Sequence, residues 1–350
     1  MIRILFTFLE RVKKARGRQL IKVAVATAAI LFYAASGFMY FESVAKPDLS
    51  WGDAIWWAFV TMTTVGYGDF FPATALGRYL VGIPTMVFGI SILGYLLSTV
   101  ATYLIEARSK ELKGMLELNV HDHILVIHYP SKERVLKLLK DLRADEKTAK
   151  LPVVLIDDTL EELPEELMEK GVRFVSGSPT SEAVLTRACF REALYAVILA
   201  KDQMDKASDN HNLAVVLTLE KLHSETYTVT EVIDPEHIDL LYRAGCDSVV
   251  CLATLTTNFL AQELLDPGVQ AVMQELTDNT VGQQIYITPI ESLQRWTYSE
   301  LAEALRERGV LTLGIERGRQ VLLNPTAETK LEQGDKAITI ATERPQAVSR

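Results

Sequence analysis

The sequence predicts a membrane-embedded helical domain, with two spanning helices and a short re-entrant helix between them, followed by an α/β domain and a small α+β lobe. Three observations lead to this fold class. Two long apolar runs lie at 21–41 and 76–105. A shorter apolar and aromatic stretch lies between them. From His121 onwards, short apolar runs alternate with amphipathic segments, which is typical of βαβ units with a parallel sheet.

The composition indicates a chain that is only partly embedded in a membrane. Of its 350 residues, 49% are hydrophobic and 23% are charged, and the formal net charge is −9. Segment 1–20 is nevertheless basic, with Glu10 as its only acid. This asymmetry argues against nucleic acid as a partner and for a membrane surface near the start of the chain. The three cysteines have no CxxC spacing, so they indicate neither a disulfide framework nor a zinc site.

The first apolar run, IKVAVATAAILFYAASGFMYF (21–41), has the length of a helix that crosses a hydrocarbon core of ~30 Å. A signal peptide is the alternative, but the run is long for one. The second run, 76–105, has the length of a tilted helix that continues past the membrane, and Pro84 is expected to kink it. Lysines and arginines precede the first run and follow the second one. The positive-inside rule therefore predicts a multi-pass protein of the plasma membrane with both termini in the cytoplasm.

Segment 1–20 is predicted to be a basic interfacial helix lying along the inner membrane surface. Between the spans, Trp51–Met62 is predicted to be a short helix, with Ser50 and Asp53 as plausible N-caps. This helix is too brief to cross the bilayer, so the chain would return through the residues TVGYG. Non-helical backbone at membrane depth is tolerated only where protein buries it or where it lines a watery cavity. The return strand is therefore predicted to line a pore.

The residues TTVGYGD (63–69) give this strand a specific chemistry. Glycines reach backbone angles that are closed to other residues, and alternating such angles turns successive carbonyls towards one axis. The carbonyls of this strand, with one threonine hydroxyl, could then replace the water shell of a potassium ion. One chain supplies one strand, so a ring needs a homotetramer. The predicted selectivity filter consists of Thr64, Val65, Gly66, Tyr67 and Gly68.

The stretch WWAFVTMTTVGYGD (56–69) resembles the pore helix and filter of potassium channels with two transmembrane helices. The resemblance implies K⁺ as the permeant ion, with Trp57, Tyr67 and Asp69 bracing the filter from behind. It also implies a gating hinge in the second span at Gly89, for which Gly94 is the alternative. No arginine-rich helix precedes the first span, so a voltage sensor is not expected.

The cytoplasmic part is predicted to be a Rossmann-like parallel sheet. Its first strand-to-helix turn reads IHYPSKE (127–133) and contains no glycine, so NAD is not expected to bind there. Asp157 ends the second strand, where an acid can contact a ribose, although a solvated strand-end acid is the simpler interpretation. Neither a nucleophile–base pair nor an acid dyad is present, so the chain is not expected to be an enzyme. The predicted strands are 123–129, 151–157, 172–177, 195–200, 226–232 and 246–252.

The order of these parts resembles the RCK domain, the regulator of potassium conductance, which is related to the soluble subunits of Trk and Ktr uptake systems. The resemblance covers about 115–342. It implies that RCK domains pair into a gating ring, completed by soluble copies that could start at Met115, although an ordinary linker methionine is equally compatible. Membrane lipid is a further expected partner. The expected domains are the interfacial helix 1–20, the pore domain 21–106, a linker 107–120, the RCK N-lobe 121–253, dimerising crossover helices 254–278 and the RCK C-lobe 279–350.

In calcium-gated members of this family, acids at the ends of the fourth and fifth strands bind calcium through oxygen ligands. This sequence keeps Glu231, but Ile233 and Ala200 occupy positions where further acids are expected. Asp202 and Asp209 could rebuild a cation site with Glu231. A solvated acidic loop is the alternative, because charge runs are usually solvated.

Three functional hypotheses follow. The first is a potassium channel gated by an intracellular ligand, a divalent cation such as calcium. The second is a channel whose RCK ring binds nucleotide or is structural, with gating at the filter. The third, from another class, is a membrane-tethered regulatory subunit of a potassium transporter. The complete TVGYG stretch counts against the transporter, whose filters usually retain single glycines.

Overall fold

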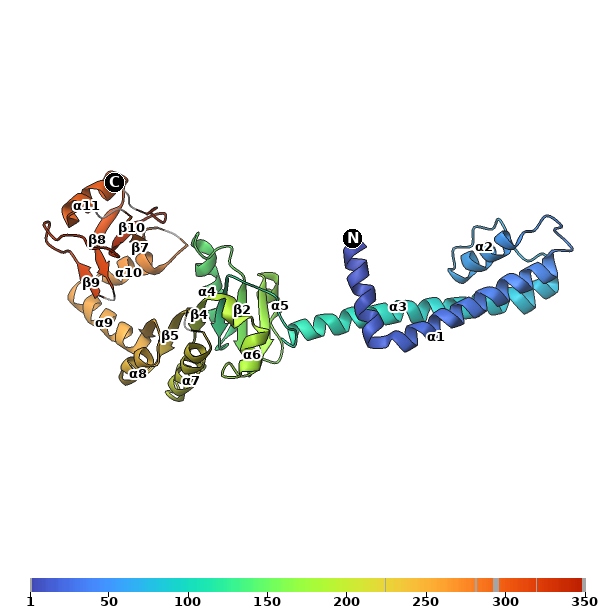
Figure 1. Cartoon of the computed structure of the whole chain (residues 1–350), viewed down its shortest axis with the longest axis horizontal. Helices are drawn as coiled ribbons and strands as arrows, with labels where there is room; N and C mark the ends of the chain where they lie inside the picture. Colours follow the sequence, from blue (N-terminus) through green and yellow to red (C-terminus); the bar gives the residue numbers. More distant parts are fainter. Residues whose placement is uncertain (1, 224, 281, 292–295, 319, 348–350) are drawn as a thin grey trace. The chain divides into compact units, whose positions relative to one another are not determined.

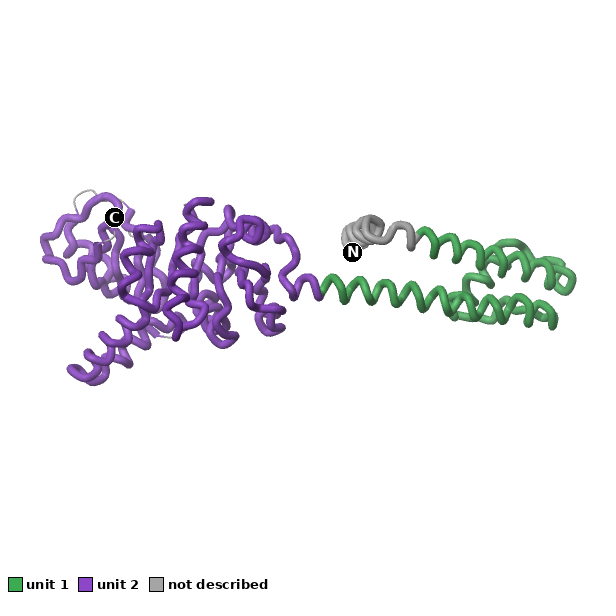
Figure 2. The backbone as a smooth tube through the Cα atoms, turned by 90° about the horizontal axis from the view of Figure 1, so that it is seen from below, with its two compact units in different colours: residues 1–108 green, residues 109–350 purple. Residues whose placement is uncertain are grey.

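The chain forms two compact units, Met1–Arg108 and Ser109–Arg350 (Figure 2). Each unit has its own hydrophobic core. The computed structural model of the whole chain is shown in Figure 1. Within 2–20 it describes only the backbone, so the predicted interfacial side chains of segment 1–20 lie outside the described residues. The remaining residues outside its description are 1, 224, 281, 292–295, 319 and 348–350.

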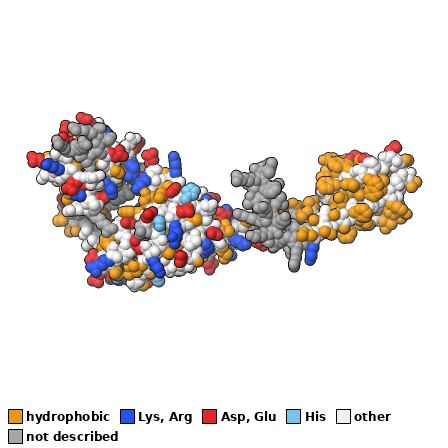
Figure 3. Space-filling view, viewed as in Figure 1, with side chains coloured by type: hydrophobic (Ala, Val, Ile, Leu, Met, Phe, Trp, Pro, Cys, Tyr) orange, Lys and Arg blue, Asp and Glu red, His pale blue; other side chains and the backbone are white. Residues whose placement is uncertain are grey.

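The N-terminal unit contains the two predicted spanning helices. Helix α1 runs over Ile2–Glu42, and helix α3 runs over Ile83–Leu112. The windows Ile21–Glu42 and Gly77–Leu112 are long and apolar enough to cross a membrane. Hydrophobic side chains cover the visible face of this unit, whereas charged side chains are spread over the other one (Figure 3). Such an apolar surface is typical of a protein embedded in lipid. The presence of α1 and α3 confirms the helical part of the predicted fold class.

Helix α2 (Trp51–Met62) is the short helix predicted between the spans, and Ser50 is its N-cap. The Asp53 N–H donates to Ser50 Oγ at 3.2 Å, and the Ser50 N–H donates back to Asp53 Oδ2 at 3.0 Å. This reciprocal capping box explains why the helix begins at Trp51. Alanines let α2 pack closely against α1, and the core between them contains Ala34, Ala35, Phe38, Ala54, Trp57, Ala58 and Val81.

A π-helix, η1 (Gly77–Gly82), leads directly into α3. Pro84 is the second residue of α3, so the irregular backbone precedes it. A π-helical segment is one way in which a helix absorbs a disturbed hydrogen-bond pattern, and the kink at Pro84 stays a prediction.

The C-terminal unit is built on a six-stranded parallel sheet with the strand order β3-β2-β1-β4-β5-β6. The order reverses between β1 and β4, which creates a topological switch point at the carboxyl ends of these strands. The predicted Rossmann-like sheet is therefore confirmed. The strands are β1 (His123–Ile127), β2 (Val153–Asp157), β3 (Val172–Ser176), β4 (Ala193–Ile198), β5 (Tyr227–Val232) and β6 (Ser248–Cys251).

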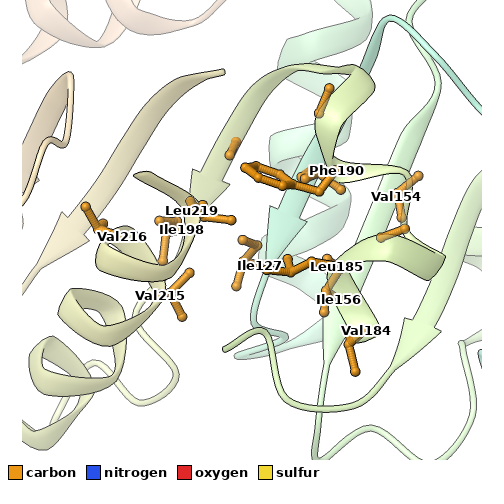
Figure 4. Close-up of a cluster of buried hydrophobic side chains, with 14 of the residues drawn as sticks. Ile127, Val154, Ile156, Val184, Leu185, Phe190, Ile198, Val215, Val216 and Leu219 are labelled. Carbon is orange, nitrogen blue, oxygen red and sulfur yellow. The ribbon is translucent and has the colours of Figure 1, made fainter. Parts of the chain in front are cut away.

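Alternate residues of the strands feed two cores, one on each face of the sheet. Ile127, Ile156 and Ile198 pack against Leu185 and Leu219 on one face (Figure 4). Helices α4 and α5 cover the opposite face through apolar side chains such as Val135 and Leu167. The helices of this part are α4 (Lys132–Ala144), α5 (Glu165–Glu169), α6 (Glu182–Arg187), α7 (Ala207–Leu222) and α8 (Ile238–Arg243), with 3₁₀ turns η2 (Phe190–Glu192) and η3 (Pro235–His237).

Two helices and a small antiparallel sheet complete this unit. Helices α9 (Leu252–Leu265) and α10 (Val269–Thr277) contain no buried residue among those described, and Leu264 is 83% exposed. The following lobe has a four-stranded sheet of order β7-β10-β8-β9, as the predicted C-lobe requires. Its elements are β7 (Gln284–Pro289), α11 (Tyr298–Arg306), β8 (Leu311–Arg317), β9 (Gln320–Leu323) and β10 (Lys336–Ala341).

The segment that follows α3 is bonded to the parallel sheet. The predicted linker 107–120 is helical as far as Leu112, whose carbonyl accepts the Leu163 N–H at 2.8 Å. The Gly114 carbonyl accepts the Ser176 N–H and an Arg187 Nη1 hydrogen, both at 3.0 Å. The segment just after α3 is therefore joined to the backbone of β3 and to the Arg187 side chain of α6.

Gly114→Ala is expected to loosen this junction. Gly114 has φ +60, and an added Cβ would collide with the Ser176 nitrogen and lie 2.7 Å from Phe174 Cδ1. We expect β3 to open more easily by about 1–3 kcal/mol, measured as faster amide hydrogen exchange over residues 172–176. Gly171→Ala is the matched control, because Gly171 also has positive φ (+79) but no described atom within 4 Å of the added Cβ. Equal losses in both variants would contradict the proposed collision.

Candidate functional site

The backbone after α2 alternates between two conformations. Thr64, Gly66 and Gly68 have φ of 62°, 57° and 78°, whereas neither Val65 nor Tyr67 is among the described residues with positive φ. Such alternation can turn successive carbonyl groups to one side of a strand, which is the arrangement that a ring of carbonyl ligands needs. Thr64 is not a glycine, so its left-handed conformation stores strain, as functional segments often do.

The start of this strand is tethered to the last turn of α2. The Val65 N–H donates to the Val60 carbonyl at 3.0 Å, and the Thr64 N–H donates to the Thr61 carbonyl at 3.1 Å. An added Cβ at Gly66 or Gly68 would meet no described atom within 4 Å. Glycine is therefore needed at both positions because of the backbone angles, and not because a Cβ would collide with a described atom.

The far end of the strand is braced by Trp56. Its Nε1 donates to Asp69 Oδ2 at 2.8 Å, and its ring stacks on Tyr67 with centroids 5.8 Å apart. The sequence-based assignment gave this role to Trp57. Trp57 instead stacks on Phe38 of α1 at 4.3 Å, because adjacent residues of a helix point about 100° apart. Within this chain, the tryptophan that contacts Asp69 is thus Trp56.

Glu42 is a buried carboxylate that sequence reasoning missed. It is the last residue of α1 and is fully buried. Its Oε1 accepts the Thr74 hydroxyl at 2.7 Å, and its Oε2 accepts the Ala73 N–H at 2.9 Å. The carboxylate thereby ties the end of α1 to the residues that precede η1. The available signal was an acid at the end of an apolar run, since such residues within spanning segments are usually functional.

Gly89 is the place where α3 meets the end of α2. Gly89 is buried, and an added Cβ would lie 2.6 Å from Met62 Cα. Gly94 has no described atom within 4 Å of such a Cβ. The observed reason for a glycine at 89 is close packing, and a hinge role for Gly89 stays a prediction.

In the second unit, Glu231 is held by a cation of the same chain. It is 5% exposed, and its Oε1 lies 2.6 Å from Arg134 Nη2. The Ala200 N–H donates to its Oε2 at 2.7 Å, and Gln203 Nε2 donates to its Oε1 at 2.9 Å. Arg134 therefore supplies the positive charge that the sequence analysis had assigned to a bound cation.

The other two acids of the predicted cation site have partners of their own. Asp209 accepts the N–H groups of Ile233 and Asp234, both at 2.9 Å, and contacts His237 Nδ1 at 2.9 Å. Asp202 accepts the Met204 N–H at 2.9 Å. These contacts close local turns, so the described structure does not bring Glu231, Asp202 and Asp209 together around one ion.

Asp157, expected as a ribose contact, is fully buried at the end of β2. Its Oδ2 accepts the Tyr129 N–H at 2.9 Å, and its Oδ1 accepts the N–H groups of Thr159 and Leu160 at 2.7 Å. The turn after β1 is thus closed onto this carboxylate, which leaves it badly placed to receive a ribose hydroxyl.

His128 lies beside Asp157 and was also missed. It has φ +73 and is 2% exposed. Burial lowers the pKa of His128 to about 4, so the imidazole is neutral near pH 7. The signal in the sequence was a bulky residue at a turn where glycine is the usual choice. Met115, the predicted start of a soluble copy, is exposed, and that start stays a prediction.

Arg134→Met should leave the Glu231 carboxylate buried without its cation. We expect β5 to open more easily by about 2–3 kcal/mol, measured by hydrogen exchange over residues 227–232 in the full-length protein. Adding Glu231→Gln to Arg134→Met should recover part of this loss, because a neutral amide needs no counter-charge. If the effects of the two substitutions simply add, the ion pair is not what holds Glu231.

Comparison with known proteins agrees with this geometry. A family described as "Ion channel" matches residues 26–106, and the TrkA-N domain family matches residues 130–252. The chain is 28% identical to the calcium-gated potassium channel TvoK of Thermoplasma volcanium over 293 residues, which cover 82% of this chain and 81% of that one. It is 26% identical to potassium channel protein 1 of Methanocaldococcus jannaschii over 292 residues, covering 81% and 83% of the two chains.

Among solved structures, the chain is similar to the one described as "GsuK channel bound to NAD", with 22% identity and a TM-score of 0.45. The match covers 92% of this chain and 57% of the solved chain, so this protein spans little more than half the length of that structure. The named relatives are channels rather than enzymes. With its two candidate spanning helices, its TVGYG strand and its match to the TrkA-N domain family, the chain is similar to potassium channels over most of its length.

Proposed function

We propose that four copies of this chain form a potassium-selective channel in the plasma membrane, with residues 64–68 of each copy lining one side of the filter. The alternating φ values of Thr64, Gly66 and Gly68 carry this proposal, because they allow neighbouring carbonyls to face one axis. A single strand offers ligands on one side of an ion only. Four strands around an axis complete the oxygen cage that replaces the hydration shell of potassium.

The orientation of the proposed channel follows from its charges. Arg108, Lys110 and Lys113 follow the second span, and segment 1–20 is basic, which favours the cytoplasm for both ends. Anionic lipid of the inner leaflet is the natural partner of these side chains. The strand 64–68 then lies towards the outer side of the membrane, and the RCK domain lies in the cytoplasm.

The proposed gate is driven by paired RCK domains. The exposed leucines of α9, such as Leu260, Leu264 and Leu265, suit pairing of two such domains. Because the chain after α3 is bonded to β3 through Gly114, a change of angle between paired domains would pull on the end of α3. A ligand that prefers the open ring by a few kcal/mol is enough to shift the gate.

Calcium is one candidate for this ligand, since the relative TvoK is described as calcium-gated. In this chain the matching acid Glu231 carries an internal cation, Arg134, so calcium would have to displace a guanidinium. This contact favours the second candidate, in which the ring binds nucleotide or is structural and gating occurs at the filter. The turn closed onto Asp157 also argues against a nucleotide bound in the usual manner of a Rossmann-like fold.

Gly66→Ala is expected to abolish potassium flux. Gly66 has φ +57, which alanine adopts only with strain, so the carbonyl alternation should be lost. The measurement is potassium flux into liposomes that contain the reconstituted full-length channel, with sodium as the competing ion. Gly52→Ala in α2 is the control, because its Cβ would make only an ordinary contact of 3.5 Å with Ser50 Oγ. A wild type that passes sodium as readily as potassium would refute the filter assignment.

Two glycines of α3 should respond differently to the same substitution. Gly89→Ala places a Cβ 2.6 Å from Met62 Cα, whereas Gly94→Ala meets no described atom within 4 Å. We expect Gly89→Ala to shift the end of α2, lower potassium flux and destabilise the pore by about 1–3 kcal/mol. Gly94→Ala should leave both properties close to those of the wild type. A larger effect of Gly94→Ala than of Gly89→Ala would show that the contact between Gly89 and Met62 is not what makes a glycine of α3 important.

A further inference from the structure

We propose that His128, Asp157 and Asp158 form a binding site for a divalent transition-metal ion of the zinc class. The site lies at the carboxyl ends of β1 and β2, next to the switch point of the parallel sheet. It is separate from Glu231, whose charge is taken by Arg134. A role of this ion in gating rests on the proposed function, whereas its binding does not.

The fold brings these residues together from two neighbouring strands. His128 directly follows β1, and Asp157 is the last residue of β2. The parallel register pairs Ile127 with Ile156, and the His128 N–H donates to the Ile156 carbonyl at 2.9 Å. One ring nitrogen of His128 and one carboxylate oxygen from each aspartate lie within 4.8 Å of one another. This separation allows one ion to reach all three ligands after small side-chain movements.

The His128 imidazole is the observation that points to a ligand. It is 2% exposed, and neither ring nitrogen has a hydrogen-bond partner in the described structure. A buried polar group without a partner costs free energy, and glycine would fit φ +73 without strain. The low pKa of His128 keeps the ring neutral, with a lone pair available near pH 7. A metal ion would satisfy this lone pair.

Asp157 is prepared as a ligand by its neighbours. Its Oδ1 is saturated by the Thr159 hydroxyl and by the N–H groups of Thr159 and Leu160. Among the described residues, one hydrogen bond reaches its Oδ2, from the Tyr129 N–H at 2.9 Å, so one lone pair of this oxygen is left for an ion. Hydrogen bonds of this kind orient a metal-binding carboxylate and hold it in place.

Asp158 provides the solvent-exposed side of the site. Its Oδ1 lies 2.6 Å from Lys201 Nζ, and the side chains of Asp158 and Lys201 are 37% and 27% exposed. The lysine ammonium is a positive charge at the place where a divalent ion would bind. Metal binding therefore requires Lys201 to move away from Asp158, and the lysine acts as an internal competitor.

The donor set selects the class of ion. One imidazole nitrogen with two carboxylate oxygens suits zinc and similar transition metals. Calcium and magnesium prefer ligand sets made of oxygen alone. Three protein ligands leave a fourth tetrahedral position for water or for a group from a neighbouring domain.

Direct binding tests the site without reference to ion flux. Full-length channel in detergent is stripped with a chelator, dialysed and titrated with zinc, with calcium and magnesium as comparison ions. We expect one zinc per chain and much weaker binding of the other two ions. His128→Gly should weaken zinc binding by about 100-fold or more, while glycine suits the local backbone. His121→Ala, which removes an exposed histidine before the same strand, should bind zinc as the wild type does.

Two further variants separate this site from adventitious binding. Asp158→Asn should weaken zinc binding, whereas Lys201→Met should strengthen it by about two- to fivefold, because an exposed ion pair of this kind contributes little. Equal zinc binding by wild type and His128→Gly, or weaker binding by Lys201→Met, would overturn the proposal. Unchanged thermal unfolding of metal-free His128→Gly would show that its loss of zinc is not caused by misfolding.

Potassium flux then decides whether the ion regulates the channel. We expect zinc to change the flux of wild type and of His121→Ala, and to leave the flux of His128→Gly unaffected. Stoichiometric zinc binding with no change in wild-type flux would overturn the regulatory role and leave the site itself established. Absence of potassium flux in every protein, with zinc still bound, would instead contradict the proposed channel function.

Discussion

Backbone carbonyl groups that leave a helix at membrane depth need partners, because hydrocarbon offers none. The segment after α2 has alternating backbone angles at Thr64, Gly66 and Gly68, which in the proposed channel would turn its carbonyls towards an ion. The rest of the N-terminal unit supports this arrangement. Helix α2 anchors the start of the strand, Trp56 braces its end, and α3 packs against Met62 through Gly89.

In the C-terminal unit, the groups that need partners are buried carboxylates. Carboxylates lie at the carboxyl ends of its strands, where an open sheet usually receives a ligand. Glu231 is neutralised by an arginine, and Asp157 is satisfied by backbone N–H groups. At this same edge, His128 is deeply buried, and neither of its ring nitrogens has a hydrogen-bond partner among the described residues. The group at this edge that lacks a partner is therefore an imidazole and not one of the acids of the expected cluster.

Local signals made much of this structure predictable. The run lengths, the Ser50 capping box and the strand pattern are properties of neighbouring residues, and the structure reproduces them. The choice between Trp56 and Trp57 depends on how α2 is rotated, which the core with α1 decides. The partner of Glu231 is Arg134, 97 residues away in the chain, and no local pattern indicates that pairing. At the turn after β1, the missing glycines were noticed, but the histidine in their place was not.

The buried carboxylate of Glu42 has a mechanical consequence. It accepts hydrogen bonds from the Thr74 hydroxyl and from two backbone N–H groups ahead of η1, so the end of α1 is fastened to the segment that leads into α3. In the channel proposed above, this fastening would oppose sliding of α3 along α1 as a rigid rod. A pull on the far end of α3 would instead turn the helix about its contact with Glu42.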